Sequence, residues 1–390
     1  MPSITIKRGR AKPLWFGHPW VYSEAIERTE GEIAPGDEVS VLDNDGRLIG
    51  RGFLSPRSQI RVRLGTWKDE PLDDAWLTAR LAAARALRVR LGLPCAETDA
   101  YRLVNSEGDA LPGLIVDVYG DAVAVQLTTM GMKRREAAIY DALQALLSPA
   151  TIYEIGGGHF AALEGFEPSA RVVRGTPRPQ VPCREHGVAL VVEPLAGQKT
   201  GYFLDQRENR AHVGALARGA RVLDLYCYAG GFALAAARGG AASVTAVDAS
   251  ARALERTQAH FAANQLGPVT TVESDVFNYL EQAPAGAFDL VVCDPPKCAR
   301  ARKDLEAALK GYRRLNTLAL QACAPGALLA TASCSQQVGA EEFERVLAGA
   351  AKDAHRRLSV LSIGSQAPDH VVPVGFPKNH YLKFFLCAVD

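Results

Sequence analysis

The sequence lacks the features that direct a chain into a membrane or out of the cell. No stretch of the 390 residues approaches the roughly 20 consecutive apolar side chains that cross a bilayer. The N-terminal segment Met1–Lys12 has no apolar core of the kind found in signal peptides. The chain has eight cysteines but no C-x-x-C pair, which disfavours a disulfide framework and a zinc site. We therefore expect a reduced, cytoplasmic protein that binds no metal.

The common nucleotide-binding fingerprints are also missing. Neither the G-x-G-x-x-G turn of dinucleotide-binding folds nor the P-loop motif occurs, which disfavours a dinucleotide or ATP as cofactor. The net charge of +1 says nothing about nucleic acid by itself. In two short segments, Lys7–Lys12 and Lys297–Lys303, every charged residue is basic. Such clusters can neutralise phosphates, although most basic clusters are simply solvated surface.

The order of the expected elements divides the chain into three domains. Residues 1–72 contain short strands with turns, which predicts a small β-barrel. Residues 73–185 mix helices with strands, which predicts an α+β module, and the proline-rich segment Val172–Cys183 is interpreted as a connector. The clearest elements of these two parts are strands at Asp37–Leu42, Arg47–Phe53, Gln59–Leu64, Leu103–Asn105, Gly113–Tyr119 and Ala122–Thr128, and helices at Asp73–Gly92 and Lys133–Leu147.

Residues 186–390 alternate between strand and helix patterns, which is typical of an α/β domain with a doubly wound, mostly parallel sheet. Continuous apolar runs such as residues 289–293 favour a sheet that is buried on both faces. The expected strands are Ala220–Tyr226, Ser243–Asp248, Val269–Glu273, Phe288–Asp294 and Ala327–Ser333, with two late strands at Arg357–Ile363 and Tyr381–Ala388. The expected helices are Gly231–Arg238, Arg252–Gln265, Asp304–Ala322 and Ala340–Ala351.

Carboxylates mark four consecutive strand ends of this last domain. They are Asp224, which precedes the Gly230-Gly231 turn, and Asp248, Asp275 and Asp294. Ligands of open α/β sheets bind beyond the carboxyl ends of the strands. Any one of these aspartates can be read as a helix cap. The set of four favours a cationic cofactor without phosphate, an adenosine joined to a sulfonium amino acid.

Several motifs then identify a family. The last domain resembles class I methyltransferases. Together with the upstream motif Gly197–Arg207, the segments Asp294–Lys297 and Ser333–Ser335 make the chain similar to the RlmI-like bacterial 5-methylcytosine methyltransferases of large-subunit ribosomal RNA. The segments Gly17–Tyr22 and Asn105–Asp117 extend this resemblance over the whole chain. It implies S-adenosylmethionine as cofactor and an N-terminal PUA domain, which is an RNA-binding module.

The resemblance also implies the residues of the site. The upstream motif would close over the cofactor, the glycine turn would contact its methionine end, Asp248 its ribose and Asp275 its adenine. The full set of expected cofactor contacts is Gln198, Lys199, Thr200, Phe203, Asp205, Arg207, Asp224, Leu225, Tyr226, Cys227, Tyr228, Gly230, Asp248, Ala249, Asp275, Val276, Asp294 and Pro295. The expected RNA contacts are Lys12, Trp20, Lys297, Arg300 and Arg302.

Cys334 is the expected nucleophile because it lies at the end of the fifth strand, next to the strand that ends at Asp294. Carbon 5 of cytosine attacks a methyl donor only after a thiolate has added to carbon 6. Asp294 would bond the ring nitrogen or the exocyclic amine during this addition. Many RNA cytosine-5 enzymes carry a second cysteine directly after the DPP-type motif. Here Lys297 stands in that place and Cys298 follows, so the base that removes the carbon-5 proton is left open.

Two other functions stay open from the sequence. One is methylation of another RNA position, such as guanine nitrogen-7, with Cys334 in a structural role. The other is a non-catalytic RNA-binding assembly factor, which the intact acidic strand ends disfavour. A small-molecule methyltransferase is disfavoured because it would not need the N-terminal barrel. The expected partner is ribosomal RNA, free or in an assembling large subunit, and a homodimer is left open.

Overall fold

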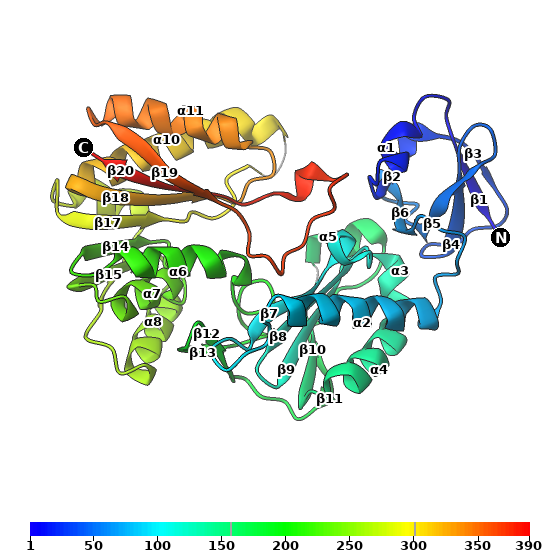
Figure 1. Cartoon of the computed structure of the whole chain (residues 1–390), viewed down its shortest axis with the longest axis horizontal. Coiled ribbons are helices and arrows are strands. Elements are labelled where there is room, and N and C mark those ends of the chain that lie inside the picture. Colours follow the sequence, from blue (N-terminus) through cyan, green and yellow to red (C-terminus); the bar gives the residue numbers. More distant parts are fainter. Residues whose placement is uncertain (157, 300–301) are drawn as a thin grey trace. The chain divides into compact units, whose positions relative to one another are not determined.

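The chain passes repeatedly between two structural units, each built from segments that are distant in the sequence (Figure 1). The computed structural model describes residues 1–156, 158–299 and 302–390. The first unit holds Met1–Gly187, Val191–Leu204 and Pro368–Asn379, and the second holds Val188–Leu190, Asp205–Ala367 and His380–Asp390. The expected domain boundaries at residues 72/73 and 185/186 stay a prediction. Among the described residues, no helix combines the length and the hydrophobicity that crossing a bilayer requires.

A six-stranded sheet forms the N-terminal part of the first unit, and its core includes Ile4, Val39 and Val62. The elements here are β1 (Ser3–Ile6), α1 (Lys12–Trp15), β2 (Trp20–Tyr22), β3 (Ile26–Glu30), β4 (Glu38–Leu42), β5 (Leu48–Leu54) and β6 (Ile60–Thr66). The strand order is β2-β6-β5-β4-β1-β3. The Asp43 carboxylate accepts a hydrogen bond from the backbone N–H of Arg47 (2.9 Å), which closes the hairpin between β4 and β5. The three strands predicted for this part are confirmed.

A five-stranded sheet with order β11-β10-β9-β8-β7 forms the rest of the first unit. The strands are β7 (Ala100–Asn105), β8 (Leu114–Tyr119), β9 (Ala122–Leu127), β10 (Thr151–Glu154) and β11 (Arg171–Gly175). The helices are α2 (Asp74–Arg90), α3 (Met130–Lys133), α4 (Glu136–Leu147) and α5 (Gly158–Glu164). The helix α2 begins where predicted because the Asp73 carboxylate accepts from the backbone N–H of Trp76 (2.9 Å). The second predicted helix, Lys133–Leu147, corresponds to α4, which begins three residues later than predicted and ends at the predicted residue.

The segment interpreted as a connector is only partly one. Its ends lie in β11 and in β12 (Val181–Glu185), which forms a two-stranded sheet with β13 (Val188–Val192). Residues 176–180 alone lie outside strands. The prolines that suggested a connector do not prevent pairing, because Pro182 lies in a two-stranded sheet and β11 is an edge strand.

A buried ion pair anchors the C-terminal segment of the first unit. The guanidinium of Arg88, which is fully buried, binds the Asp109 carboxylate with two nitrogens and donates to the backbone carbonyl of Asp369. The Asn105 side chain donates to the carbonyl of Val371 (2.9 Å). The motif Asn105–Asp117 therefore contributes structural contacts that hold residues 368–379 in this unit.

The second unit is a seven-stranded sheet with helices on both faces (Figure 1). Its strands are β14 (Arg221–Leu225), β15 (Ser243–Asp248), β16 (Thr270–Glu273), β17 (Phe288–Cys293), β18 (Cys323–Ser333), β19 (Leu358–Gly364) and β20 (Lys383–Val389). Its helices are α6 (Arg207–Leu216), α7 (Gly231–Arg238), α8 (Ala251–Ala263), α9 (Val276–Gln282), α10 (Leu305–Ala322) and α11 (Ala340–Asp353). The predicted α/β class and all seven predicted strands are confirmed.

The strand order β16-β15-β14-β17-β18-β20-β19 places the chain reversal between β14 and β17. The first five strands of this order are parallel, and β20 is antiparallel to both of its neighbours. Leu225 of β14 pairs with Val247 of β15 and with Cys293 of β17, so the carboxyl ends of the central strands lie at one edge of the sheet. A crevice at such a reversal is where open α/β sheets bind ligands.

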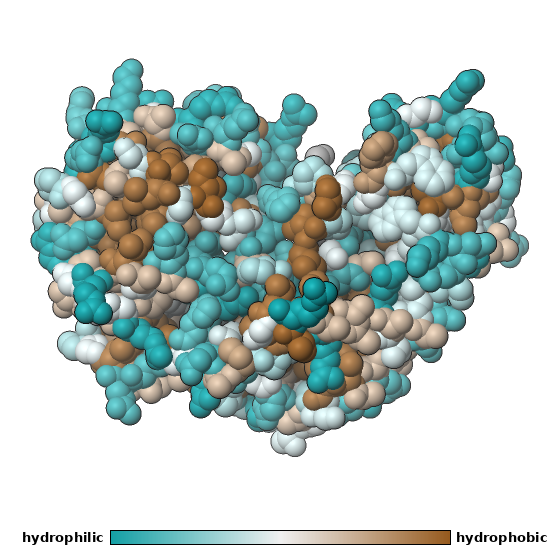
Figure 2. All heavy atoms as spheres, viewed as in Figure 1, coloured by the Kyte–Doolittle hydropathy of each residue, from teal (hydrophilic) through white to brown (hydrophobic). Residues whose placement is uncertain are grey.

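Apolar side chains are exposed at one end of this sheet. Among the residues that the structure describes, the edge strand β19 pairs with β20 alone, and Val360, Leu361 and Ile363 on it are each more than two-fifths exposed. Hydrophobic side chains gather over β19 in the space-filling view (Figure 2). In the single chain this edge therefore presents an apolar surface to water.

Candidate active site

The turn between β14 and α7 has an unusual backbone. Tyr226 and Tyr228 adopt left-handed conformations, with φ of 58° and 50°, although neither is glycine. The backbone N–H of Cys227, between them, donates to the carbonyl of Val247 (3.1 Å). Non-glycine residues in this region are strained and persist where surrounding contacts hold them, often at binding sites. The strained turn lies at the sheet edge where the sequence predicts the methionine end of the cofactor.

Gly230 ends the turn and cannot carry a side chain without a clash. Its φ is 77°, and an added Cβ would lie 2.6 Å from Cγ2 of Thr257 on α8. We expect Gly230→Ala to weaken S-adenosylmethionine binding at least about tenfold, because the turn must move to relieve the overlap. Calorimetric titration measures this. Gly219→Ala is the matched control, because Gly219 also has a positive φ (71°) but nothing lies within 4 Å of its added Cβ. Equal losses in both variants would contradict the role given to the turn.

Asp224 is the buried carboxyl group of the site. It accepts a hydrogen bond from the backbone N–H of Ala233 in α7 (2.9 Å), and its Oδ1 accepts none from the described residues. Burial is the largest cause of a raised pKa of Asp224, and together with the charges of Asp294 and Asp248 it brings this pKa to about 8. A buried acceptor with unused capacity, among other carboxylates, suits a cationic ligand group.

Two of the other three predicted strand-end carboxylates, Asp248 and Asp275, bind nearby backbone groups. Asp248 accepts from the N–H groups of Tyr228 and Ser250 (both 2.9 Å), so it links β15 to the glycine turn. Asp275 accepts from Phe277 (2.9 Å) and Asn278 and thus caps α9. Capping and ligand binding are compatible, because a carboxylate accepts about four hydrogen bonds.

The side chain of Tyr226 lies among these groups. Burial raises its pKa most, and the charges of Cys293, Asp275, Cys298 and Asp248 add to the rise. Asp224 and Tyr226 therefore interact electrostatically with the other three predicted strand-end carboxylates, Asp248, Asp275 and Asp294. The residues present fit a cationic adenosyl cofactor. The sheet topology and these carboxylates fit the class I methyltransferase fold that the sequence resembles.

Cys334 directly follows β18, between two buried serines. The Ser333 hydroxyl lies 3.1 Å from the hydroxyl of Tyr312, which is fully buried in α10, and that hydroxyl lies 3.1 Å from Oγ of Ser335. Cys334 itself is only partly buried. The serines therefore hold the turn, while the thiol between them stays accessible.

The loop after β17 is tied to the same turn. The backbone N–H of Ala299 donates to Oγ of Ser335 (3.2 Å). Pro295 is buried, whereas Lys297 and Cys298 are exposed. Partial desolvation raises the pKa of the Cys298 thiol. Arg302 is exposed, and Arg300 lies outside the described residues.

The upstream motif divides between the two units. Gln198 and Lys199 are exposed in the first unit, and the Lys199 ammonium lies 4.4 Å from the centre of the Phe203 ring. Thr200 is buried, with its hydroxyl bound to the Asp117 carboxylate. This contact within the first unit was not predicted from the sequence.

Asp205 and Arg207 belong to the second unit and are both buried. Asp205 accepts a hydrogen bond from the hydroxyl of Tyr381 (2.7 Å), and its backbone carbonyl accepts from the N–H of Ala367. Arg207 bonds Glu208 through Nε (3.0 Å). The cofactor contacts of this motif stay predictions.

The predicted RNA contacts of the N-terminal part have different surroundings. Lys12 is exposed, 6.0 Å from the centre of the Phe16 ring, and Phe16 is 72% exposed. The Trp20 indole instead donates to the Glu107 carboxylate (2.8 Å) and packs against Phe376. Trp20 therefore has a structural role in the first unit, and RNA binding by either residue stays a prediction.

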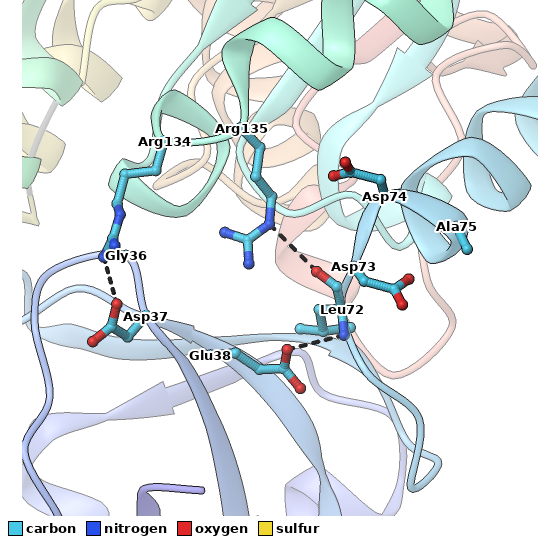
Figure 3. A pocket seen from close by; sticks show the side chains of 9 residues that line it. All are labelled: Gly36, Asp37, Glu38, Leu72, Asp73, Asp74, Ala75, Arg134 and Arg135. Atoms are coloured by element: carbon cyan, nitrogen blue, oxygen red, sulfur yellow. Dashed lines mark hydrogen bonds and ion pairs between the residues drawn. The ribbon is translucent and has the colours of Figure 1, made fainter.

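A cavity of about 530 Å³ lies in the first unit, next to the N-terminus of α2 (Figure 3). Several of its charged groups bind one another or the backbone: Arg134 pairs with Asp37, Glu38 accepts from the N–H of Leu72 (3.0 Å), and Arg135 donates to the Leu72 carbonyl (3.3 Å). None of the residues predicted for cofactor binding or catalysis lines this cavity.

Comparisons with known proteins agree with this class. Residues 4–67 match the model of the PUA-like domain, and residues 122–363 match that of S-adenosylmethionine-dependent methyltransferases. The ribosomal RNA large subunit methyltransferases I of Erwinia tasmaniensis and Alteromonas mediterranea are each 38% identical to this chain. The alignments cover 99% of this chain and 99% and 98% of the relatives.

Solved structures show the same fold. A structure described as a SAM-dependent methyltransferase from Streptococcus mutans matches with a TM-score of 0.85 at 23% identity, over 100% of both chains. The methyltransferase SMU.776, solved in complex with SAH, matches with a TM-score of 0.86 at 24% identity, also over 100% of both chains. The chain belongs to the S-adenosylmethionine-dependent methyltransferases, in the family of the ribosomal RNA large subunit methyltransferase I proteins.

Proposed function

We propose that this enzyme methylates carbon 5 of a cytosine in the RNA of the large ribosomal subunit, in the cytoplasm. The names of the relatives support ribosomal RNA as the substrate, and the PUA-like domain supports RNA binding. The observation that carries the cytosine assignment is the position of Cys334. Its partly exposed thiol follows β18, whose neighbour β17 ends next to Asp294.

S-adenosylmethionine, when bound, supplies an electrophilic methyl group. Asp224, Asp248, Asp275 and the turn from Tyr226 to Gly230 would hold it at the carboxyl ends of β14, β15 and β16. The Cys334 thiolate adds to carbon 6 of the cytosine, and the electron pair displaced from the ring double bond makes carbon 5 nucleophilic. Once carbon 5 is methylated, a base removes its proton, the double bond re-forms and the thiolate leaves carbon 6.

In this proposal, Asp294 holds the cytosine during the addition. A carboxyl group there can bond ring nitrogen 3 or the exocyclic amine, and so favour the flow of electrons into the ring. A paired cytosine must first leave its helix or be presented as a single strand. Lys297 and Arg302 are exposed on the loop and short helical turn that follow, and their charges suit the flanking phosphates.

The test is bisulfite sequencing of ribosomal RNA from a strain that lacks this gene. We expect one cytosine of large-subunit RNA to lose its protection, and the wild-type gene but not Cys334→Ala to restore it. The deletion strain carrying the empty vector is the control for growth effects. If no cytosine changes status, or if Cys334→Ala restores protection, the proposed function is wrong.

A further inference from the structure

A buried lysine contacts both residues that flank Cys334. Lys383 is the first residue of β20 and is 6% exposed. The antiparallel pairing of β20 with β18 places it opposite Ser333. Its ammonium group donates to the backbone carbonyl of Ser335 and to that of Tyr381, both at 2.7 Å. The lysine therefore spans the Ser333-Cys334-Ser335 turn from the neighbouring strand.

Charges on three other elements surround this ammonium group. The thiolate of Cys334 and the carboxylate of Glu342 on α11 favour its protonated form, and Lys297 on the loop after β17 opposes it. Desolvation is the largest of these effects, and together they lower the pKa of Lys383 to about 8. At neutral pH the amine therefore keeps its proton and its charge. Electrostatic interaction is mutual. Because the Cys334 thiolate favours the charged form of Lys383, the charged Lys383 in turn favours the Cys334 thiolate.

We propose that Lys383 is a positioning residue that fixes the Cys334 turn and stabilises the Cys334 thiolate. The inference rests on the proposed function, because a thiolate is needed only if Cys334 is the nucleophile. Burying an ammonium group carries a desolvation cost, and an apolar side chain could pair with Ser333 without it. A lysine that only stabilised the strand end would need its hydrogen bonds but not its charge.

Three variants separate the charge from the hydrogen bonds. Lys383→Met removes both, Lys383→Gln keeps donors without charge, and Lys383→Arg keeps both. Lys310→Met is the matched control, because Lys310 is exposed on α10 and pairs only with Glu306 among the described residues. Calorimetric titration with S-adenosylmethionine checks that each variant folds with an intact cofactor site.

The readout is the rate at which iodoacetamide alkylates Cys334 as a function of pH, followed by mass spectrometry of the peptide that contains it. We expect the midpoint of the rate profile to rise by about one pH unit in Lys383→Met and Lys383→Gln, which slows alkylation about tenfold at neutral pH. Lys383→Arg and Lys310→Met should keep the wild-type midpoint. Cys298 in the same sample is the internal reference.

An unchanged midpoint in Lys383→Gln would overturn the proposal and leave Lys383 a structural residue. If Lys383→Met fails to fold, the comparison of Lys383→Gln with Lys383→Arg decides the question. Alkylation needs neither RNA nor turnover, so its outcome is independent of whether Cys334→Ala remains active. The failure of this inference and the failure of the proposed function can therefore be told apart.

Discussion

Replacing Cys334 with alanine should reduce methyl transfer by at least about a thousandfold, because removal of a covalent nucleophile leaves no route to an activated carbon 5. The affinity for S-adenosylmethionine should not change, since the cofactor cluster lies at the ends of other strands. Single-turnover methylation of transcribed large-subunit RNA, with calorimetric titration of the cofactor, measures the two effects separately.

The neighbouring thiol provides the matched control for this experiment. Cys298 lies on the loop after β17, and its Sγ is 3.2 Å from the carbonyl of Pro296. Partial desolvation raises its pKa, which disfavours the thiolate. Cys298→Ala should therefore keep most of the activity. A modest loss in Cys334→Ala, similar to that in Cys298→Ala, would favour a different base position and a structural Cys334.

Binding of S-adenosylmethionine at pH 7 should release close to one proton from Asp224. The pKa of this buried carboxyl is about 8 without ligand, so it is largely protonated at pH 7. A cation bound beside it favours the carboxylate, which lowers the pKa and expels the proton. Calorimetric titrations at pH 7 in buffers of different ionisation enthalpy measure this release. The number of protons released is the slope of the observed binding enthalpy plotted against the ionisation enthalpy of the buffer.

Asp224→Asn should abolish this slope and weaken binding about tenfold to a hundredfold, the range expected for a lost charge-assisted interaction. Asp289→Asn is the control. It lies on the neighbouring strand β17, where the hydrogen bonds of Arg221 lower its pKa to about 2, so it has no proton to release. If Asp224→Asn and the wild type release the same number of protons, Asp224 is not the group that meets the cofactor's charge.

The second unit was the more predictable part of the fold, because its strands are buried runs separated by helical patterns. The helix α7 and the strand β15 begin and end at the predicted residues. The helices α6 and α9 were not predicted; α9 is short, and its start depends on the Asp275 cap. In the first unit, the prolines near β12 concealed a strand, since edge positions tolerate residues that central strands exclude.

Local sequence also indicated the acidic strand ends and the glycine turn, because each is visible in the few residues around it. It could not indicate Lys383, because Lys383 and Ser335 are 48 positions apart in the sequence. Their contact depends on the pairing of β18 with β20. Tyr312 was missed for the same reason, since its hydroxyl contacts Ser333 of β18 from the helix α10. The left-handed backbone at Tyr226 and Tyr228 has no signal in residue type, because left-handed conformations favour glycine and asparagine.

The most direct test of covalent catalysis by Cys334 uses RNA in which cytidine is replaced by 5-fluorocytidine. Fluorine at carbon 5 cannot leave as a proton does, so the adduct should persist after methylation and survive denaturing electrophoresis. We expect wild-type enzyme with S-adenosylmethionine to form this complex, with the nucleotide mass on the peptide that contains Cys334. Cys334→Ala should form none. Two results would contradict the mechanism. One is that wild-type enzyme methylates normal RNA but forms no complex with the fluorinated RNA, and the other is that Cys334→Ala forms the complex.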